Sequence, residues 1–146
     1  MSPPALARSL GLAGLAPQIA VILTLLQHDP ATRFAALALG FAYAALILSF
    51  LGGLWWGLAA RTEQPPAWLW VAAVIPSLVA LGSALPWAQG QPWPGPSLVL
   101  LGAALIAALG VDVLLQRAGI APPWWLSLRV PLSLGLGGMT VAAAFL

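Results

Sequence analysis

The sequence contains no cysteine, no lysine and a single histidine, and only eight of its 146 residues are formally charged. Without cysteine there is no disulfide, no thiol nucleophile and no thiolate ligand for zinc or an iron–sulfur cluster. Charged residues make up 5% of the chain and hydrophobic residues 62%, whereas average soluble proteins carry about 25% charged residues. The composition excludes a soluble globular enzyme and a disordered chain, and it indicates an integral membrane protein.

The few polar groups also restrict the chemistry. The five arginines are scattered along the chain and form no basic cluster, so we expect no nucleic-acid partner. His28 has only Asp29 beside it, and the sequence holds no P-loop, dinucleotide-binding glycine motif or HExxH sequence. We therefore expect no metal, no cofactor and no catalytic residue, which favours a non-enzymatic protein.

Five apolar segments are long enough to cross a bilayer, which takes roughly 20 residues of helix. They cover about residues 6–26, 32–60, 68–85, 97–115 and 130–146. The runs are continuous rather than alternating, which favours helices over a β-barrel. We predict an all-α integral membrane protein with a single domain over residues 1–146, a bundle of five transmembrane helices.

Two prolines lie in the interior of these segments, whereas Pro131 lies in the first turn of the last one, where proline is tolerated. Pro17 and Pro76 each remove a helix hydrogen bond, which predicts a kink in the first and third spans. No small-x-small cleavage site follows residue 26, so the first segment is expected to be a retained span rather than a signal peptide.

The arginines predict the orientation, because positive charge stays on the cytoplasmic side during insertion. With the N-terminus inside and the C-terminus outside, four of the five arginines fall on the inner side and only Arg33 falls outside. Six of the eight tryptophans share that inner interface, among them Trp56, Trp124 and Trp125. These rings form either an aromatic anchor belt or the wall of a pocket that opens toward the cytoplasm.

Asp112 is the acid expected within a span, where a carboxylate at the bilayer centre costs about 3 kcal/mol or more. Arg129 approaches the same interface at the start of the last segment, so we predict an Asp112–Arg129 ion pair. The pair is either a structural clamp between the last two helices or a proton or ligand site. Tyr43 lies near mid-membrane, and its hydroxyl needs a partner such as Ser49 or a carbonyl freed by a helix kink.

A stripe of small residues follows in the second segment. Gly53 and Gly57 have GxxxG spacing, Ser49 extends the stripe by one turn, and Gly52 lies beside it. Small residues four apart let two helix backbones approach closely. The stripe predicts either packing inside one bundle or homo-oligomer formation.

The same segment carries a family pattern, namely Tyr43, the run LSFLGG at residues 48–53, and Trp56 followed by Gly57. With residues 11–17, 76–78 and 123–129 and with Asp112, it resembles the domain of unknown function 3429 family. That family includes bacterial inner-membrane proteins and the mitochondrial transmembrane-protein-69 group. The resemblance implies a compact multi-span helical protein of a respiring membrane, here a multi-pass protein of the bacterial inner membrane, with no established activity. Family members often have histidine where this chain has Trp55, and this departure from the pattern weakens the idea that the family uses a histidine there for metal or proton chemistry.

Three functions are compatible with the sequence. The favoured one is a non-enzymatic accessory factor that binds a lipid or a membrane protein partner. A small transporter or channel subunit is the second, with a polar path lined by residues such as Tyr43, Ser49 and Asp112. A membrane enzyme acting on a lipid or quinone is the third, with Asp112 and Arg129 as its polar pair.

Overall fold

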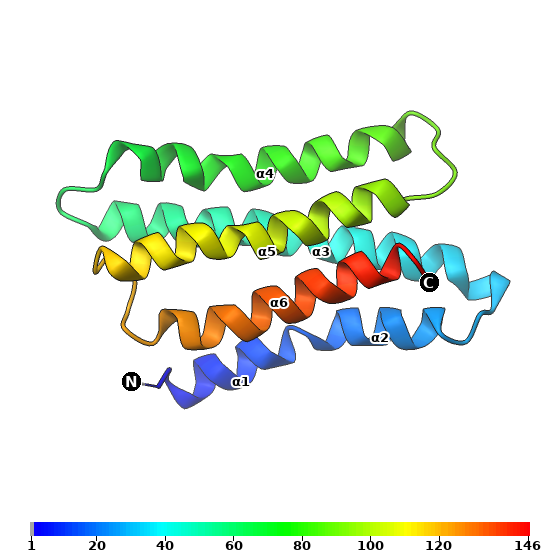
Figure 1. The fold of residues 1–146 in the computed structure, drawn as a ribbon, viewed down its shortest axis with the longest axis horizontal. Coiled ribbons are helices and arrows are strands. Elements are labelled where there is room, and N and C mark those ends of the chain that lie inside the picture. Colours follow the sequence, from blue (N-terminus) through cyan, green and yellow to red (C-terminus); the bar gives the residue numbers. More distant parts are fainter. Residues whose placement is uncertain (1) are drawn as a thin grey trace.

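The computed structural model describes residues 2–146. In this part of the chain the elements are six α-helices: α1 (Ala5–Ala13), α2 (Ala16–Leu25), α3 (Pro30–Arg61), α4 (Ala67–Ala88), α5 (Gly95–Arg117) and α6 (Trp125–Ala143). Because α1 and α2 follow each other as one interrupted segment, the helices form five spans long and apolar enough to cross a membrane (Figure 1). The prediction of an all-α membrane protein with five spans is therefore confirmed.

Capping residues mark the start of α3 and the end of α5. Asp29 caps α3, since its carboxylate accepts a hydrogen bond from the Ala31 N–H at 2.9 Å, and Pro30 occupies the first helical position. At the end of α5, Gly119 adopts a φ of 70°. The Ile120 N–H then donates back to the Leu115 carbonyl oxygen at 3.0 Å, which satisfies a carbonyl of the last turn and reverses the chain toward α6.

The first span is broken between α1 and α2. Pro17 lies in the first turn of α2 and offers no N–H to the carbonyl of Ala13 four residues earlier, which favours a break in the helix at this point. The Tyr43 hydroxyl of α3 donates to the carbonyl oxygen of Gly14, inside the break, at 2.5 Å. The predicted kink at Pro17 is confirmed. The Gly14 carbonyl at this break is the hydrogen-bond partner of the half-buried Tyr43. Pro76, in contrast, lies within the uninterrupted helix α4.

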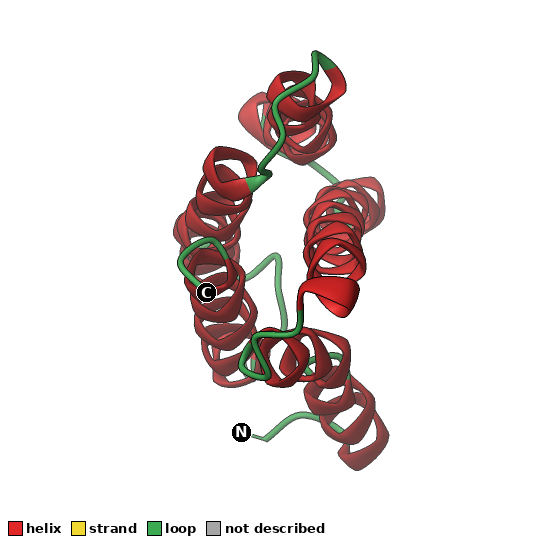
Figure 2. Cartoon of the chain, turned by 90° about the vertical axis from the view of Figure 1, so that its right-hand side faces the viewer, coloured by secondary structure: helices red, strands yellow, loops and turns green. Residues whose placement is uncertain are grey.

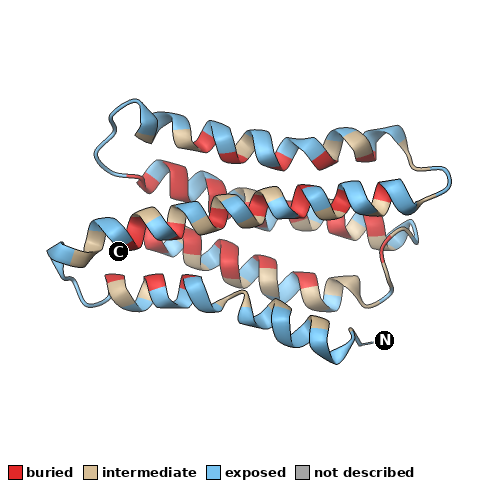
Figure 3. Cartoon of the chain, turned by 180° about the vertical axis from the view of Figure 1, so that it is seen from behind, coloured by how far each residue is buried: buried red, intermediate tan, exposed pale blue. Residues whose placement is uncertain are grey.

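The spans form a bundle that is elongated in cross-section (Figure 2). Helix α4 packs against α3 and α5, α6 packs along α5, and α2 packs against α3 and α6. Figures 1 and 2 show α4 at one edge and the α1/α2 span at the opposite edge. Helix α1 is the most weakly held element, since it contacts chiefly α6 and contains no buried residue (Figure 3).

Close helix contacts occur at three glycines. A Cβ added at Gly52 would collide with the carbonyl oxygen of Ala73, where α3 meets α4. Gly102 and Gly137 face each other across α5 and α6, and a Cβ on Gly137 would lie 2.8 Å from the Gly102 carbonyl oxygen. These positions let backbones approach as small residues do in membrane helices.

The glycine stripe of the second span is divided by the structure. Gly52 packs inside the bundle, whereas Gly53 and Gly57 are exposed, and a Cβ on either would meet open space. The interpretation of packing within one bundle therefore holds for Gly52 and not for Gly53 or Gly57. The reason is helical geometry, since residues one apart point about 100° away from each other. Homo-oligomer formation through the exposed glycines stays a prediction.

Candidate functional site

Asp112 lies five residues before the end of α5, with no exposed surface. Its Oδ2 atom pairs with the Arg129 Nε at 3.1 Å. Its Oδ1 atom accepts two hydrogen bonds, from the Trp55 Nε1 at 3.0 Å and from the Trp125 Nε1 at 2.9 Å. The predicted ion pair is therefore present, and two indole N–H groups complete the shell around the carboxylate.

Helix α6 positions its part of the site by regular spacing. Trp125, Arg129 and Ser133 follow each other at intervals of four residues, which places them on one face of the helix. The Arg129 Nη2 donates to the Ser133 Oγ at 2.6 Å. The sequence prediction began this span at residue 130 because Arg129 was placed at the membrane boundary. The helix begins at Trp125, so Arg129 is one turn inside it.

The network joins three helices at one point. Trp55 comes from α3, Asp112 from α5, and Trp125 and Arg129 from α6. Arg129 is 7% exposed, so both charges of the pair are enclosed. Removing one partner of such a pair leaves an uncompensated buried charge, which typically costs 3–5 kcal/mol. The arrangement is thus a clamp that holds α5 and α6 against α3.

An apolar pocket of about 420 Å³ adjoins this clamp. Its walls come from α1, the Gly14–Leu15 break, α3, α5 and α6. The lining is almost entirely hydrophobic, with the following residues on its α1 and α6 sides: Ala7, Leu10, Gly11, Trp124, Trp125, Leu128 and Leu132. Arg129 and Ser133 are the polar side chains in its lining. This volume falls in the range of small-molecule binding sites, about 300–1,000 Å³.

One nitrogen of Arg129 is free of the clamp. The Nε and Nη2 atoms are used by Asp112 and Ser133, while Nη1 has no hydrogen-bond partner within residues 2–146. In that range Gln18 Oε1 is the fully buried polar side-chain atom without a partner, so Nη1 is not fully buried. Nη1 is thus a guanidinium donor without a partner in that range, on a residue that lines the pocket.

A second polar contact joins helices toward the opposite end of the bundle. Gln18 of α2 is fully buried, and its Nε2 donates to the Thr140 Oγ1 at 2.8 Å and to the Gly40 carbonyl oxygen at 3.3 Å. Its Oε1 is buried with no partner among the described residues. The sequence analysis did not select this cluster, although a glutamine next to Pro17 in an apolar span is a signal of a buried polar contact.

The sequence analysis singled out four polar residues of the spans, and the structure does not bring them all together: Tyr43, Ser49, Asp112 and Arg129. Asp112 and Arg129 come together, while Tyr43 bonds Gly14 at the helix break. Ser49 is half-buried and makes no side-chain hydrogen bond with the described part of the chain. The site also includes Ser133, which the sequence analysis did not name.

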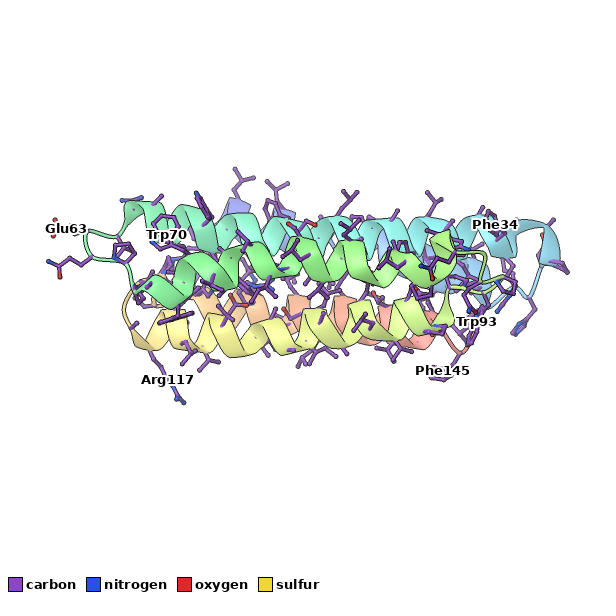
Figure 4. The ribbon with its side chains drawn as sticks, turned by 90° about the horizontal axis from the view of Figure 1, so that it is seen from above. Phe34, Glu63, Trp70, Trp93, Arg117 and Phe145 are labelled. Atoms are coloured by element: carbon purple, nitrogen blue, oxygen red, sulfur yellow. The ribbon has the colours of Figure 1, made fainter. Side chains whose placement is uncertain are left out.

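The predicted aromatic face has two parts. Trp124 and Trp125 line the pocket, with ring centroids 6.0 Å apart. Trp56 is exposed and makes an edge-to-face contact with Trp70, with centroids 4.7 Å apart. Figure 4 shows Glu63, Trp70 and Arg117 near one end of the bundle and Phe34, Trp93 and Phe145 near the other. Aromatic rings therefore lie at both ends, as expected for the two interfaces of a bilayer.

Fold and site together define a five-span helical membrane protein, in which an enclosed acid–arginine pair borders an apolar pocket. Comparison with family models identifies the family within this class. The chain belongs to the family described as Protein of unknown function (DUF3429), whose model matches residues 3–145. This match confirms the resemblance seen in the sequence. The comparisons with curated proteins and with solved structures found no match.

Proposed function

We propose that the protein is a non-enzymatic lipid-binding factor of the bacterial inner membrane. The pocket between α1 and α6 supports this proposal, because its walls are apolar and its volume of about 420 Å³ exceeds a packing defect. A hydrocarbon chain is the natural occupant of an apolar hollow that faces the bilayer.

The weak attachment of α1 supports access from the membrane. Leu6 of α1 is 71% exposed and does not line the pocket, so this helix is bounded by lipid on its outer side. Gly11 meets Leu128 and Leu132 of α6 at the pocket wall, and little else holds the helix. A lipid chain therefore needs to displace few protein contacts to enter.

The polar residues give less support to a transporter or channel. Tyr43 bonds Gly14, Asp112 pairs with Arg129, and Thr140 bonds Gln18. Each of these side chains belongs to a separate local contact, so they do not line one shared polar path. The buried carboxylate serves the clamp, where it accepts three hydrogen bonds from side chains that also hold the helices.

The proposal is tested by filling the pocket from α1. Ala7 lines the pocket, whereas Ala5, on the same helix, is exposed and does not line it. The Ala7→Phe variant is expected to lose the lipid that co-purifies with the unmodified protein in native mass spectrometry. The Ala5→Phe variant adds the same ring to the outer face and is expected to keep it. Equal lipid retention by both variants would overturn the proposal.

A further inference from the structure

The charge of the Arg129–Asp112 pair determines which lipid headgroups are compatible with the pocket. Arg129 is already neutralised by Asp112, since their side chains pair at 3.1 Å and both are enclosed. A phosphate or carboxylate beside Arg129 would leave a net negative charge within the span, which is costly in a medium of low dielectric constant. An uncharged headgroup adds no such cost. The site therefore favours a neutral lipid.

The headgroup also needs a hydrogen-bond acceptor. Arg129 Nη1 is a donor without a partner within residues 2–146, on a residue that lines the pocket. Ser133, the other residue of the lining with a polar side chain besides the indoles, already accepts from Nη2 through its Oγ. A carbonyl oxygen matches this arrangement, because it accepts hydrogen bonds and carries no net charge.

Aromatic side chains share the pocket lining with Arg129. Trp124, Trp125 and Phe50 line the same pocket as Arg129. Ring faces and edges favour contact with another flat ring, which adds about 0.5–1.5 kcal/mol beyond the burial of area in measured aromatic pairs. The aliphatic part of the lining, including Leu10, Leu128 and Leu132, suits a hydrocarbon tail.

We propose that the pocket binds a quinone-type lipid, an uncharged flat ring that bears carbonyl oxygens and an isoprenoid tail. One carbonyl accepts a hydrogen bond from Arg129 Nη1, the ring lies against the indoles of Trp124 and Trp125, and the tail runs along α1 and α6. This assignment deepens the proposed lipid-binding function and rests on it. It involves binding alone, with no electron or proton transfer.

The first experiment varies the ligand. The purified protein in neutral detergent is titrated calorimetrically with a benzoquinone that bears two isoprenyl units, and with toluene that bears the same tail. Loss of the carbonyl oxygens is expected to weaken binding roughly tenfold or more, the usual effect of removing a hydrogen bond to a charged group. Equal affinities would overturn the quinone assignment, because only apolar contact would then be at work.

The second experiment varies the protein. Arg129→Lys keeps a positive charge for Asp112 but lacks the planar fork that reaches three partners at once. The variant is expected to lose the preference for the benzoquinone over the toluene derivative. Thermal unfolding of the same sample tests whether it is folded. If Arg129→Lys is unfolded, Trp124→Leu is measured instead. This variant is expected to bind both the benzoquinone and the toluene derivative more weakly.

The outcomes separate this inference from the proposed function. If phosphatidylglycerol or diacylglycerol vesicles supply the lipid retained in the pocket and the benzoquinone does not compete with it, the quinone assignment is wrong while lipid binding stands. If Ala7→Phe and Ala5→Phe retain lipid equally, the lipid-binding function itself fails. Competition between the benzoquinone and the retained lipid, lost in Ala7→Phe, is the result that supports both.

Discussion

At the scale of single residues, the carboxylate of Asp112 is held by three nitrogen donors from two helices other than its own. Its two oxygens play different parts. Oδ2 faces the positive charge of Arg129, while Oδ1 is shared by the indoles of Trp55 and Trp125. Charge compensation and hydrogen bonding can therefore be removed separately by substitution.

Loss of the charge is expected to be the more damaging change. Asp112→Asn leaves Arg129 buried without a counter-charge and is expected to lower the free energy of unfolding by about 3–5 kcal/mol. Thermal unfolding in detergent, followed by tryptophan fluorescence, measures the effect. Glu63→Gln, the same change at an exposed residue, is the control and is expected to be neutral. The double variant Asp112→Asn/Arg129→Gln removes both charges and is expected to recover part of the loss. A double variant less stable than Asp112→Asn would contradict the clamp.

The indole donors give a smaller effect. Trp55→Phe and Trp125→Phe each keep an aromatic ring but remove one N–H from Oδ1, at an expected cost of about 1–3 kcal/mol. Trp56→Phe changes the exposed neighbour of Trp55 and is expected to leave unfolding nearly unchanged. Similar destabilisation in all three variants would show that ring volume rather than the N–H group matters.

The sequence predicted one of the three donors of this shell. An isolated acid in an apolar span requires a partner, and Arg129 was the nearest cation in the next span, so the ion pair followed from energetics. The roles of Trp55 and Trp125 did not follow, because an indole in an interfacial belt and an indole bonded to a carboxylate look alike in sequence. Gln18 and Thr140 meet across 122 residues of chain, and no local pattern records such a contact.

At the scale of helices, neighbouring glycines on α3 have opposite environments. Gly52→Ala would place a methyl group against the Ala73 carbonyl of α4, so the helices must separate, and we expect a loss of about 1–3 kcal/mol. Gly53→Ala enters open space and is expected to be neutral or slightly stabilising, because alanine is the better helix former. Thermal unfolding of the two variants, run side by side, makes the comparison. A more stable Gly52→Ala protein would refute the close contact of α3 and α4.

The spans themselves were predictable because length, hydropathy and proline clusters determine them. The sequence analysis gave about residues 32–60 for the second span, and helix α3 covers Pro30–Arg61. The exact start of α6 was missed because a charged residue was read as the end of the membrane-spanning segment. Which face a glycine presents was not predictable either, since it depends on the rotation of each helix against its neighbours.

At the scale of the whole molecule, five spans predict that the two chain ends lie on opposite sides of the membrane. Figure 1 shows the two chain ends at opposite ends of the bundle, as an odd number of spans requires. The arginine distribution predicts that the N-terminal end faces the cytoplasm.

Cysteine labelling tests this orientation without removing any native thiol, because the sequence has no cysteine. Gln91→Cys lies in the α4–α5 connector and Gln64→Cys in the α3–α4 connector, and both positions are exposed. A membrane-impermeant maleimide added to intact spheroplasts is expected to label Gln91→Cys and to spare Gln64→Cys. Labelling after lysis shows that both thiols are reactive. The reverse pattern in intact spheroplasts would invert the topology.

The position of the ion pair also has a consequence for biosynthesis. Asp112 and Arg129 lie on consecutive helices, 17 residues apart, and are joined by the short turn at Gly119. An acid that entered the bilayer on α5 alone would be exposed to hydrocarbon until its arginine was translated. Partition of α5 and α6 into the bilayer together avoids that state, because Arg129 then neutralises Asp112 as the two helices enter the hydrocarbon. Trp55 is synthesised earlier, so the two helices meet one indole of the final shell already in place on α3.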